Sequence, residues 1–110
     1  MGGCSSEREV SLNSGRNIAE ALMSLGKYEV IPVDVKSDSL DDMPKNVDAV
    51  YIALHGGWGE DGGVQAALDA RGIPYTGPGA AACRVTMDKI ATKRLLDAAG
   101  VPNAAWSVAT

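Results

Sequence analysis

Two ionisable side chains stand where a ligand could reach them. Glu7 falls in the first turn of a predicted helix, where free amides and the helix dipole favour an anion, and its carboxylate could receive a ligand's ammonium group. His55, the only histidine, follows an apolar run and precedes two glycines, so a ligand can come within hydrogen-bond reach of its ring. The alternatives are a solvated glutamate that matches the dipole and a histidine that caps the end of a strand.

Other polar residues near these two have structural explanations. Arg8 is expected in a salt bridge, and Ser11 is either a helix-face hydroxyl or a second ligand contact. Glu60 and Asp61 could suggest a metal site with His55, but adjacent carboxylates point in different directions and no third spaced ligand follows. We therefore expect both acids to serve the start of a helix.

A glycine-rich loop follows His55, and a basic pair lies further along the chain. The loop contains five glycines but matches neither common phosphate-binding pattern, so it is a weak nucleotide signature: Gly56, Gly57, Gly59, Gly62 and Gly63. Lys89 and Lys93 are one helical turn apart, which is usual for a solvated basic face.

The elements that must position these residues alternate between helix and strand. A capping box at Ser6 and Glu9 predicts a first helix over residues 6–25, ended by Gly26. The later predicted elements are a strand over 28–35, a polar linker over 37–46, a strand over 47–54, a helix from 64 ending before Gly72, a short strand over 73–76, a turn over 77–79 and a helix over 84–99.

This order predicts an α/β domain with a parallel sheet. The near-continuous apolar run of residues 47–54 is typical of a strand buried on both faces at the sheet centre, and the loop at its carboxyl end is a usual ligand site. Gly2 and Gly3 lead straight into the first helix, although such a loop normally follows a parallel strand. A first strand is thus apparently missing, and we expect unpaired edges on its neighbours.

Composition excludes several classes of protein. The chain has room for one domain, is 45% hydrophobic and 22% charged, and has a net charge of −4 without a basic stripe, so nucleic acid is not expected as a partner. Neither a membrane-spanning run nor a secretory signal is visible, which favours the cytoplasm and no membrane partner. Cys4 and Cys83 lack metal-ligand spacing and are expected to be reduced thiols.

Taken together, the motifs resemble the D-alanine:D-alanine ligase family in the same order across nearly the whole chain. Residues 55–66 fit the pattern H-G-x-x-G-E-D-G-x-apolar-Q-small at every fixed position. The remaining motifs are Gly2-Gly3, Ser6-Glu7-Arg8-Glu9-Val10-Ser11-Leu12, Tyr75-Thr76-Gly77, Met87-Asp88-Lys89 and Thr92-Lys93.

The resemblance implies an α/β fold of the pre-ATP-grasp type, a Rossmann-like parallel sheet with helices on both faces. It implies a substrate domain over residues 1–103 and the start of a truncated ATP-grasp region over 104–110. Glu7 would hold the ammonium of the first D-alanine as a catalytic residue together with Ser11 and His55, and Val10 and Gly56 would complete the substrate contacts. Lys89 would contact the phosphates of ATP, and no residue of this chain is expected to bind metal.

The same resemblance implies cofactors and partners. ATP and Mg²⁺ would be bound mainly by segments that this chain lacks, so we expect the chain alone to be inactive. D-alanine and the remainder of the ligase are the expected partners, with a homodimer at full length. Two other interpretations stay open: a stand-alone, non-catalytic amino-acid binding module, and a ligase for D-alanine:D-lactate or D-alanine:D-serine, whose second substrate is chosen largely by residues beyond Thr110.

Overall fold

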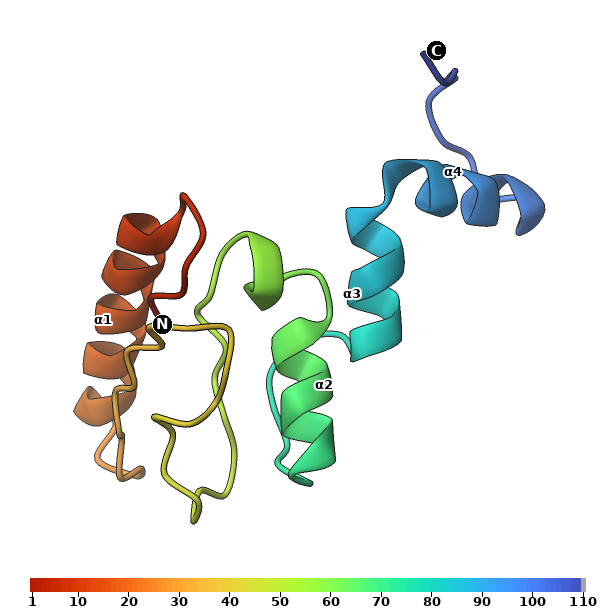
Figure 1. Ribbon diagram of the computed structural model, residues 1–110. Coiled ribbons are helices and arrows are strands. Elements are labelled where there is room, and N and C mark those ends of the chain that lie inside the picture. Colours follow the sequence, from red (N-terminus) through yellow and green to blue (C-terminus); the bar gives the residue numbers. More distant parts are fainter. Residues whose placement is uncertain (110) are drawn as a thin grey trace.

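Glycines end three of the helices in the computed structural model, which describes residues 1–109 (Figure 1). The helices are α1 (Arg8–Ser24), the 3₁₀ helix η1 (Gly57–Gly59), α2 (Gly63–Ala70), α3 (Ala80–Met87) and α4 (Lys89–Ala98). Gly26, Gly72 and Gly100 follow α1, α2 and α4 with φ of 62°, 66° and 68°. Glycine adopts this left-handed conformation without strain, so the predicted ends of these helices are confirmed.

The start of α1 differs from the prediction. The expected capping box of Ser6 and Glu9 is wrong, because the N-cap residue is Glu7 and no side chain caps the helix. Ser5 makes the hydrogen bonds at this position. Its Oγ accepts the backbone N–H of Glu7 at 3.1 Å and donates to the carbonyl oxygen of His55 at 2.6 Å. The first turn of α1 is therefore tied to the loop that follows residue 54.

The predicted single helix over residues 84–99 is also wrong. Asp88 has an extended backbone (ψ 101°) and divides the segment into α3 and α4. Its carboxylate accepts the N–H of Ala91 at 2.9 Å, which is the usual way in which aspartate starts a helix. Thr92 stabilises the junction between α3 and α4, because its hydroxyl donates to the carbonyl oxygen of Val85 at 2.6 Å.

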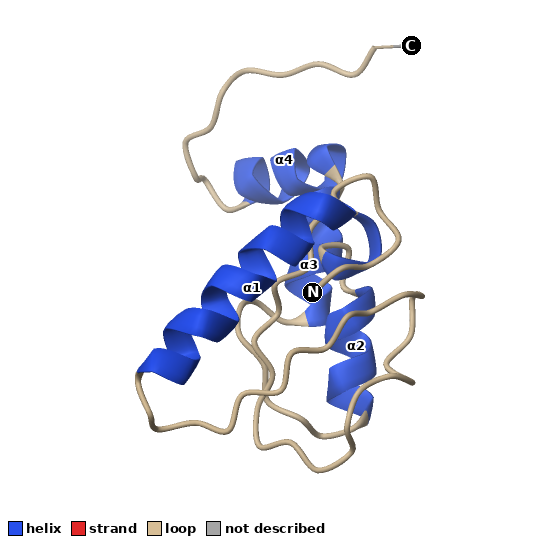
Figure 2. Cartoon of the chain, turned by 90° about the vertical axis from the view of Figure 1, so that its left-hand side faces the viewer, coloured by secondary structure: helices blue, strands red, loops and turns tan. Residues whose placement is uncertain are grey.

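The predicted parallel sheet is not formed as regular strands. No strand occurs among residues 1–109 (Figure 2), and pairing is limited to two isolated parallel bridges, Gly2 with Val35 and Val50 with Tyr75. A regular strand needs consecutive bridges, and neither bridge continues along the described chain. Burial on both faces of residues 47–54 is likewise wrong, because Tyr51 is 53% exposed.

One apolar core joins the extended segments to α2. Its buried members are Val35, Leu40, Met43, Leu54, Val64, Leu68 and Ile73. Leu40 and Met43 belong to the segment that the sequence predicted to be a polar linker, so residues 37–46 contribute to the core. Arg71 holds this segment by donating to the carbonyl oxygen of Leu40 at 3.0 Å.

The carboxyl-terminal helices form an arm that leaves this core. α3 packs against α2, and α4 packs against α3 and lies away from α1 (Figure 1). The principal extents of 48 × 26 × 26 Å reflect this elongated arrangement. Within the described part of the chain, none of the helices combines the length and the apolar character that a bilayer crossing requires.

Leu68 offers a direct test of the core. Its side chain is 0% exposed, so Leu68→Ala should lower the free energy of unfolding by about 3 kcal/mol through lost burial and a residual cavity. Urea denaturation followed by circular dichroism measures this change. Leu95→Ala, at a leucine that is 59% exposed, is the matched control, and an equal loss in both variants would contradict this description of the core.

Candidate functional site

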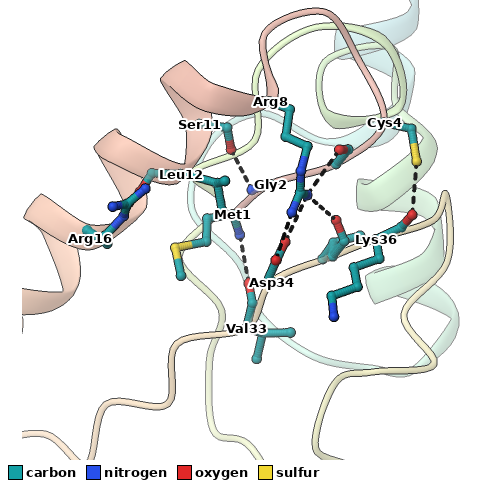
Figure 3. Close-up of polar contacts among 12 residues, drawn as sticks. Met1, Gly2, Cys4, Arg8, Ser11, Leu12, Arg16, Val33, Asp34 and Lys36 are labelled. Carbon is teal, nitrogen blue, oxygen red and sulfur yellow. Dashed lines mark hydrogen bonds and ion pairs between the residues drawn. The ribbon is translucent and has the colours of Figure 1, made fainter.

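The amino-terminal segment is held between two extended segments that are far apart in the sequence. Ser11 Oγ accepts the N–H of Gly2 at 2.8 Å (Figure 3). The same hydroxyl donates to the carbonyl oxygen of Ala53 at 2.5 Å. On the other side, the N–H of Gly3 donates to the carbonyl oxygen of Val35 at 2.7 Å. Residues 1–3 thus link the segment that ends at Val35 to the segment that leads to His55.

Gly2 requires its lack of a side chain. Its φ is 91°, and a Cβ at this position would overlap the Asp34 carboxylate and the Arg8 guanidinium. Gly15 has a similar role on α1, because the side chain of Met1 packs directly over it. These two glycines let the amino-terminal segment approach both α1 and Asp34 closely.

Arg8 fastens the same segment from the first turn of α1. Its guanidinium binds the Asp34 carboxylate with both nitrogens, at 2.9 and 2.8 Å, which confirms the predicted salt bridge. It also donates to the carbonyl oxygens of Gly3 at 3.3 Å and Val35 at 3.2 Å (Figure 3). The hydrogen bonds from Arg8 hold the pKa of Asp34 below its ordinary value, and Asp34 in turn raises the pKa of Arg8.

Glu7, His55 and Gly56 are brought together by this arrangement. Gly56 has a φ of 70°, and a Cβ built on it would lie 2.5 Å from Glu7 Oε2 and 3.0 Å from Ser5 Oγ. The Glu7 carboxylate therefore lies against the backbone of Gly56, next to His55. Glu7 is exposed and His55 is half-buried, so both remain open to a ligand.

The other predicted site residues are placed differently. Val10 is 58% exposed on the first turns of α1. Lys89 is exposed at the start of α4, and since α4 packs against α3, the structure does not bring Lys89 to Glu7 and His55. Ser11 is 0% exposed and uses its hydroxyl within the protein, so its geometry favours positioning of Gly2 over direct contact with a ligand.

Sequence reasoning missed two hydroxyls of this site. Ser5 holds the carbonyl oxygen of His55, and Ser14 Oγ lies 3.1 Å from the His55 ring at Nε2. Ser14 is three residues after Ser11 and so shares a helix face with it. Ser11 and Ser14 lie at this spacing on an otherwise apolar helix face, and this pattern could have indicated that Ser14 faces the site.

The space at the site itself is small. A cavity of about 10 Å³ lies between the amino-terminal loop and the loop after Leu54, lined by Gly3, Ser5, His55 and Gly56 among others. A cavity of that volume holds one water molecule at most, so any larger ligand would bind on the open side of Glu7 and His55. Among residues 1–109, no group of three or more His, Cys, Asp or Glu side chains is suited to a metal ion.

A wider groove lies between α2, α3 and the turn after Thr76. Its volume is about 610 Å³, and Gln65 lines it. Gln65 Nε2 donates to the carbonyl oxygen of Gly59 at 3.2 Å, whereas its buried Oε1 has no hydrogen-bond partner within residues 1–109. Cys83, also on this groove, is a buried free thiol, and Cys4 is an exposed one.

Comparison with known proteins finds one family. Residues 37–78 match a family model described as the N-terminus of D-ala D-ala ligase. A D-alanine--D-alanine ligase of Desulforudis audaxviator is 53% identical over 103 residues, which cover 93% of this chain and 33% of that protein. One of Glaesserella parasuis is 49% identical over 109 residues, covering 98% of this chain and 36% of that protein.

Solved structures agree with these relatives. A D-alanine--D-alanine ligase from Bacillus anthracis, complexed with ATP, superposes with a TM-score of 0.81 at 39% identity, covering 91% of this chain and 33% of that one. The D-alanyl-alanine synthetase A of Vibrio cholerae superposes with a TM-score of 0.80 at 32% identity, covering 93% of this chain and 36% of that one. The chain spans about a third of the length of the relatives that it matches.

The Arg8–Asp34 ion pair should make the stability of the fold depend on pH in the acid range. A carboxyl group with a lowered folded pKa stabilises the protein above its unfolded pKa, about 4, and loses that contribution as the pH falls through the folded pKa. Asp34→Asn should therefore be less stable than the parent at neutral pH, and the difference should shrink below about pH 4. Urea midpoints at several pH values measure it, with exposed Asp48→Asn as the control. A difference that stays constant with pH would contradict the role of this ion pair.

Proposed function

We propose that this chain, which matches the N-terminal part of D-alanine--D-alanine ligases, is the part of an ATP-dependent ligase that holds the first D-alanine. The observation that carries the proposal is the Glu7 carboxylate lying against Gly56, the residue that follows His55. An amino acid carries an ammonium and a carboxylate, and these two side chains offer an anion for the first and a hydrogen-bond donor for the second.

Each residue of the site has a part in this proposal. Glu7 binds the ammonium, since an ammonium that leaves water needs a fixed carboxylate partner. His55 orients the substrate carboxylate, and Gly56 leaves room for Glu7 because a Cβ there would displace it. Ser11 acts through Gly2, and Val10 borders the substrate from α1.

The proposed reaction joins two D-alanine molecules. The carboxylate of the first would accept the γ-phosphoryl group of ATP, with ADP as the leaving group, and become an acyl phosphate. The amine of the second would attack the acyl carbon, losing a proton and releasing inorganic phosphate, to form the dipeptide used in peptidoglycan. The contribution of this chain is binding and orientation of the first substrate. Holding the reacting carboxylate in one place lowers the entropy cost of the step.

The described residues include one group that could contact the phosphates of ATP. Lys89 begins α4, where the helix dipole favours an anion, and its exposed ammonium suits a phosphate group. Asp88 already takes one amide of that turn, so Lys89 is the group that would meet the phosphates. When bound, ATP supplies the phosphoryl group and Mg²⁺ neutralises its charge, and other segments of the ligase would hold most of both.

The proposed organisation follows the same division. Residues 1–103 form the substrate domain and residues 104–110 are the start of the ATP-grasp region. Of these, Thr110 lies outside the described residues. The expected partners are D-alanine, the remainder of the ligase and a second copy of the full-length protein. The chain by itself is not expected to turn over substrate, and a cytoplasmic location belongs to the same proposal.

Glu7→Gln in a ligase that contains this chain tests the proposal. Loss of the charged hydrogen bond to the ammonium should weaken the first D-alanine site roughly tenfold or more, and the affinity for ATP should not change. Steady-state kinetics, with KM measured for the first D-alanine and for ATP, reads both effects. Glu9→Gln is the matched control, since Glu9 is an exposed acid of the same helical turn. Unchanged affinity for the first D-alanine in Glu7→Gln would refute the role of Glu7.

A further inference from the structure

Two serines of the amino-terminal part hold the only histidine of the chain. Ser5 Oγ donates to the carbonyl oxygen of His55 at 2.6 Å, and Ser14 Oγ meets Nε2 of the ring at 3.1 Å. Because Ser14 lies in the middle of α1, its position is set by the helix. The backbone and the ring of His55 are therefore both restrained before any ligand binds.

The donor in the hydrogen bond between Ser14 and His55 follows from the other acceptors that the Ser14 hydroxyl could use. Some helical hydroxyls of this chain donate to carbonyl oxygens of their own helix, as Ser24 does to Ala21 at 2.7 Å and Thr86 to Ala82 at 3.0 Å. Within residues 1–109, no such bond is formed by Ser14. Its proton is free to be donated to Nε2, and an imidazole nitrogen that accepts a hydrogen bond carries no proton of its own.

We propose that Ser14 is a positioning residue that holds neutral His55 as the tautomer protonated at Nδ1. Which ring nitrogen carries the proton is set by the hydrogen bond that the other makes. None of the hydrogen bonds among residues 1–109 uses Nδ1, so its N–H is left as a donor for a bound anionic group. If the proposed function holds, that group is the carboxylate of the amino acid whose ammonium binds Glu7.

NMR on the ligand-free chain tests the tautomer directly. Because His55 is the only histidine, ¹⁵N-labelled histidine gives a single ring spectrum, recorded at about pH 9, where an ordinary imidazole is neutral. Long-range couplings to the ring protons identify each nitrogen, and the unprotonated nitrogen has the larger downfield ¹⁵N shift. The expected result is an unprotonated Nε2 in the parent chain. A protonated Nε2 would overturn the proposal.

Substitutions separate the effect of Ser14 from folding. Ser14→Ala should shift the tautomer ratio away from Nδ1–H by roughly two- to tenfold, the size of one net hydrogen bond. Ser14→Thr keeps the hydroxyl and should restore the parental ratio. Ser24→Ala makes the same change at the exposed end of α1 and should have no effect. An unchanged ratio in Ser14→Ala, in a chain whose circular dichroism matches the parent, would also overturn the proposal.

These readings are independent of the proposed function. The tautomer is measured without D-alanine, ATP or turnover, so a failure of the D-alanine assignment would appear in the Glu7→Gln kinetics and leave the NMR result as it is. A protonated Nε2 in the parent would remove the role of Ser14 while Glu7 could still bind the ammonium.

Discussion

The whole candidate site depends on the way in which residues 1–3 are held between two extended segments. Ser11 connects Gly2 to Ala53 from inside the protein. Arg8 connects Gly3 to Asp34 and Val35 from the edge (Figure 3). Both side chains come from the start of α1. The helix that carries Glu7 is thereby fixed relative to the chain that carries His55, and a ligand meets groups whose separation is already set.

The fold was predictable to the extent that local chemistry decides it. Glycine ended three helices as predicted, because the left-handed conformation is available to it at low cost. The sequence analysis predicted one continuous helix over residues 84–99, whereas the structure divides it at Asp88, which serves as the N-cap of α4. Regular strands were predicted from the apolar residues within each segment, yet a strand exists only where a neighbour continues the pairing, and a pattern within one segment does not provide that neighbour.

The residues of the site were more predictable than the contacts that connect them. Spacing and resemblance indicated Glu7, His55 and Gly56, and the structure brings these three together. Ser11 is buried in the protein interior. No sequence pattern distinguishes a buried serine of this kind from one that faces a ligand. Lys89 lies on the α3–α4 arm, whose placement depends on the packing of α3 against α2. Contacts between distant segments are what a single sequence reveals least.

A crystal structure of a ligase containing this chain, with D-alanine bound, would show directly whether the Glu7 carboxylate receives the ammonium of the first D-alanine. We expect the amine nitrogen within about 3 Å of a Glu7 carboxylate oxygen, with the substrate carboxylate on the side of His55. D-alanine bound away from Glu7, for example in the groove beside Gln65, would contradict it.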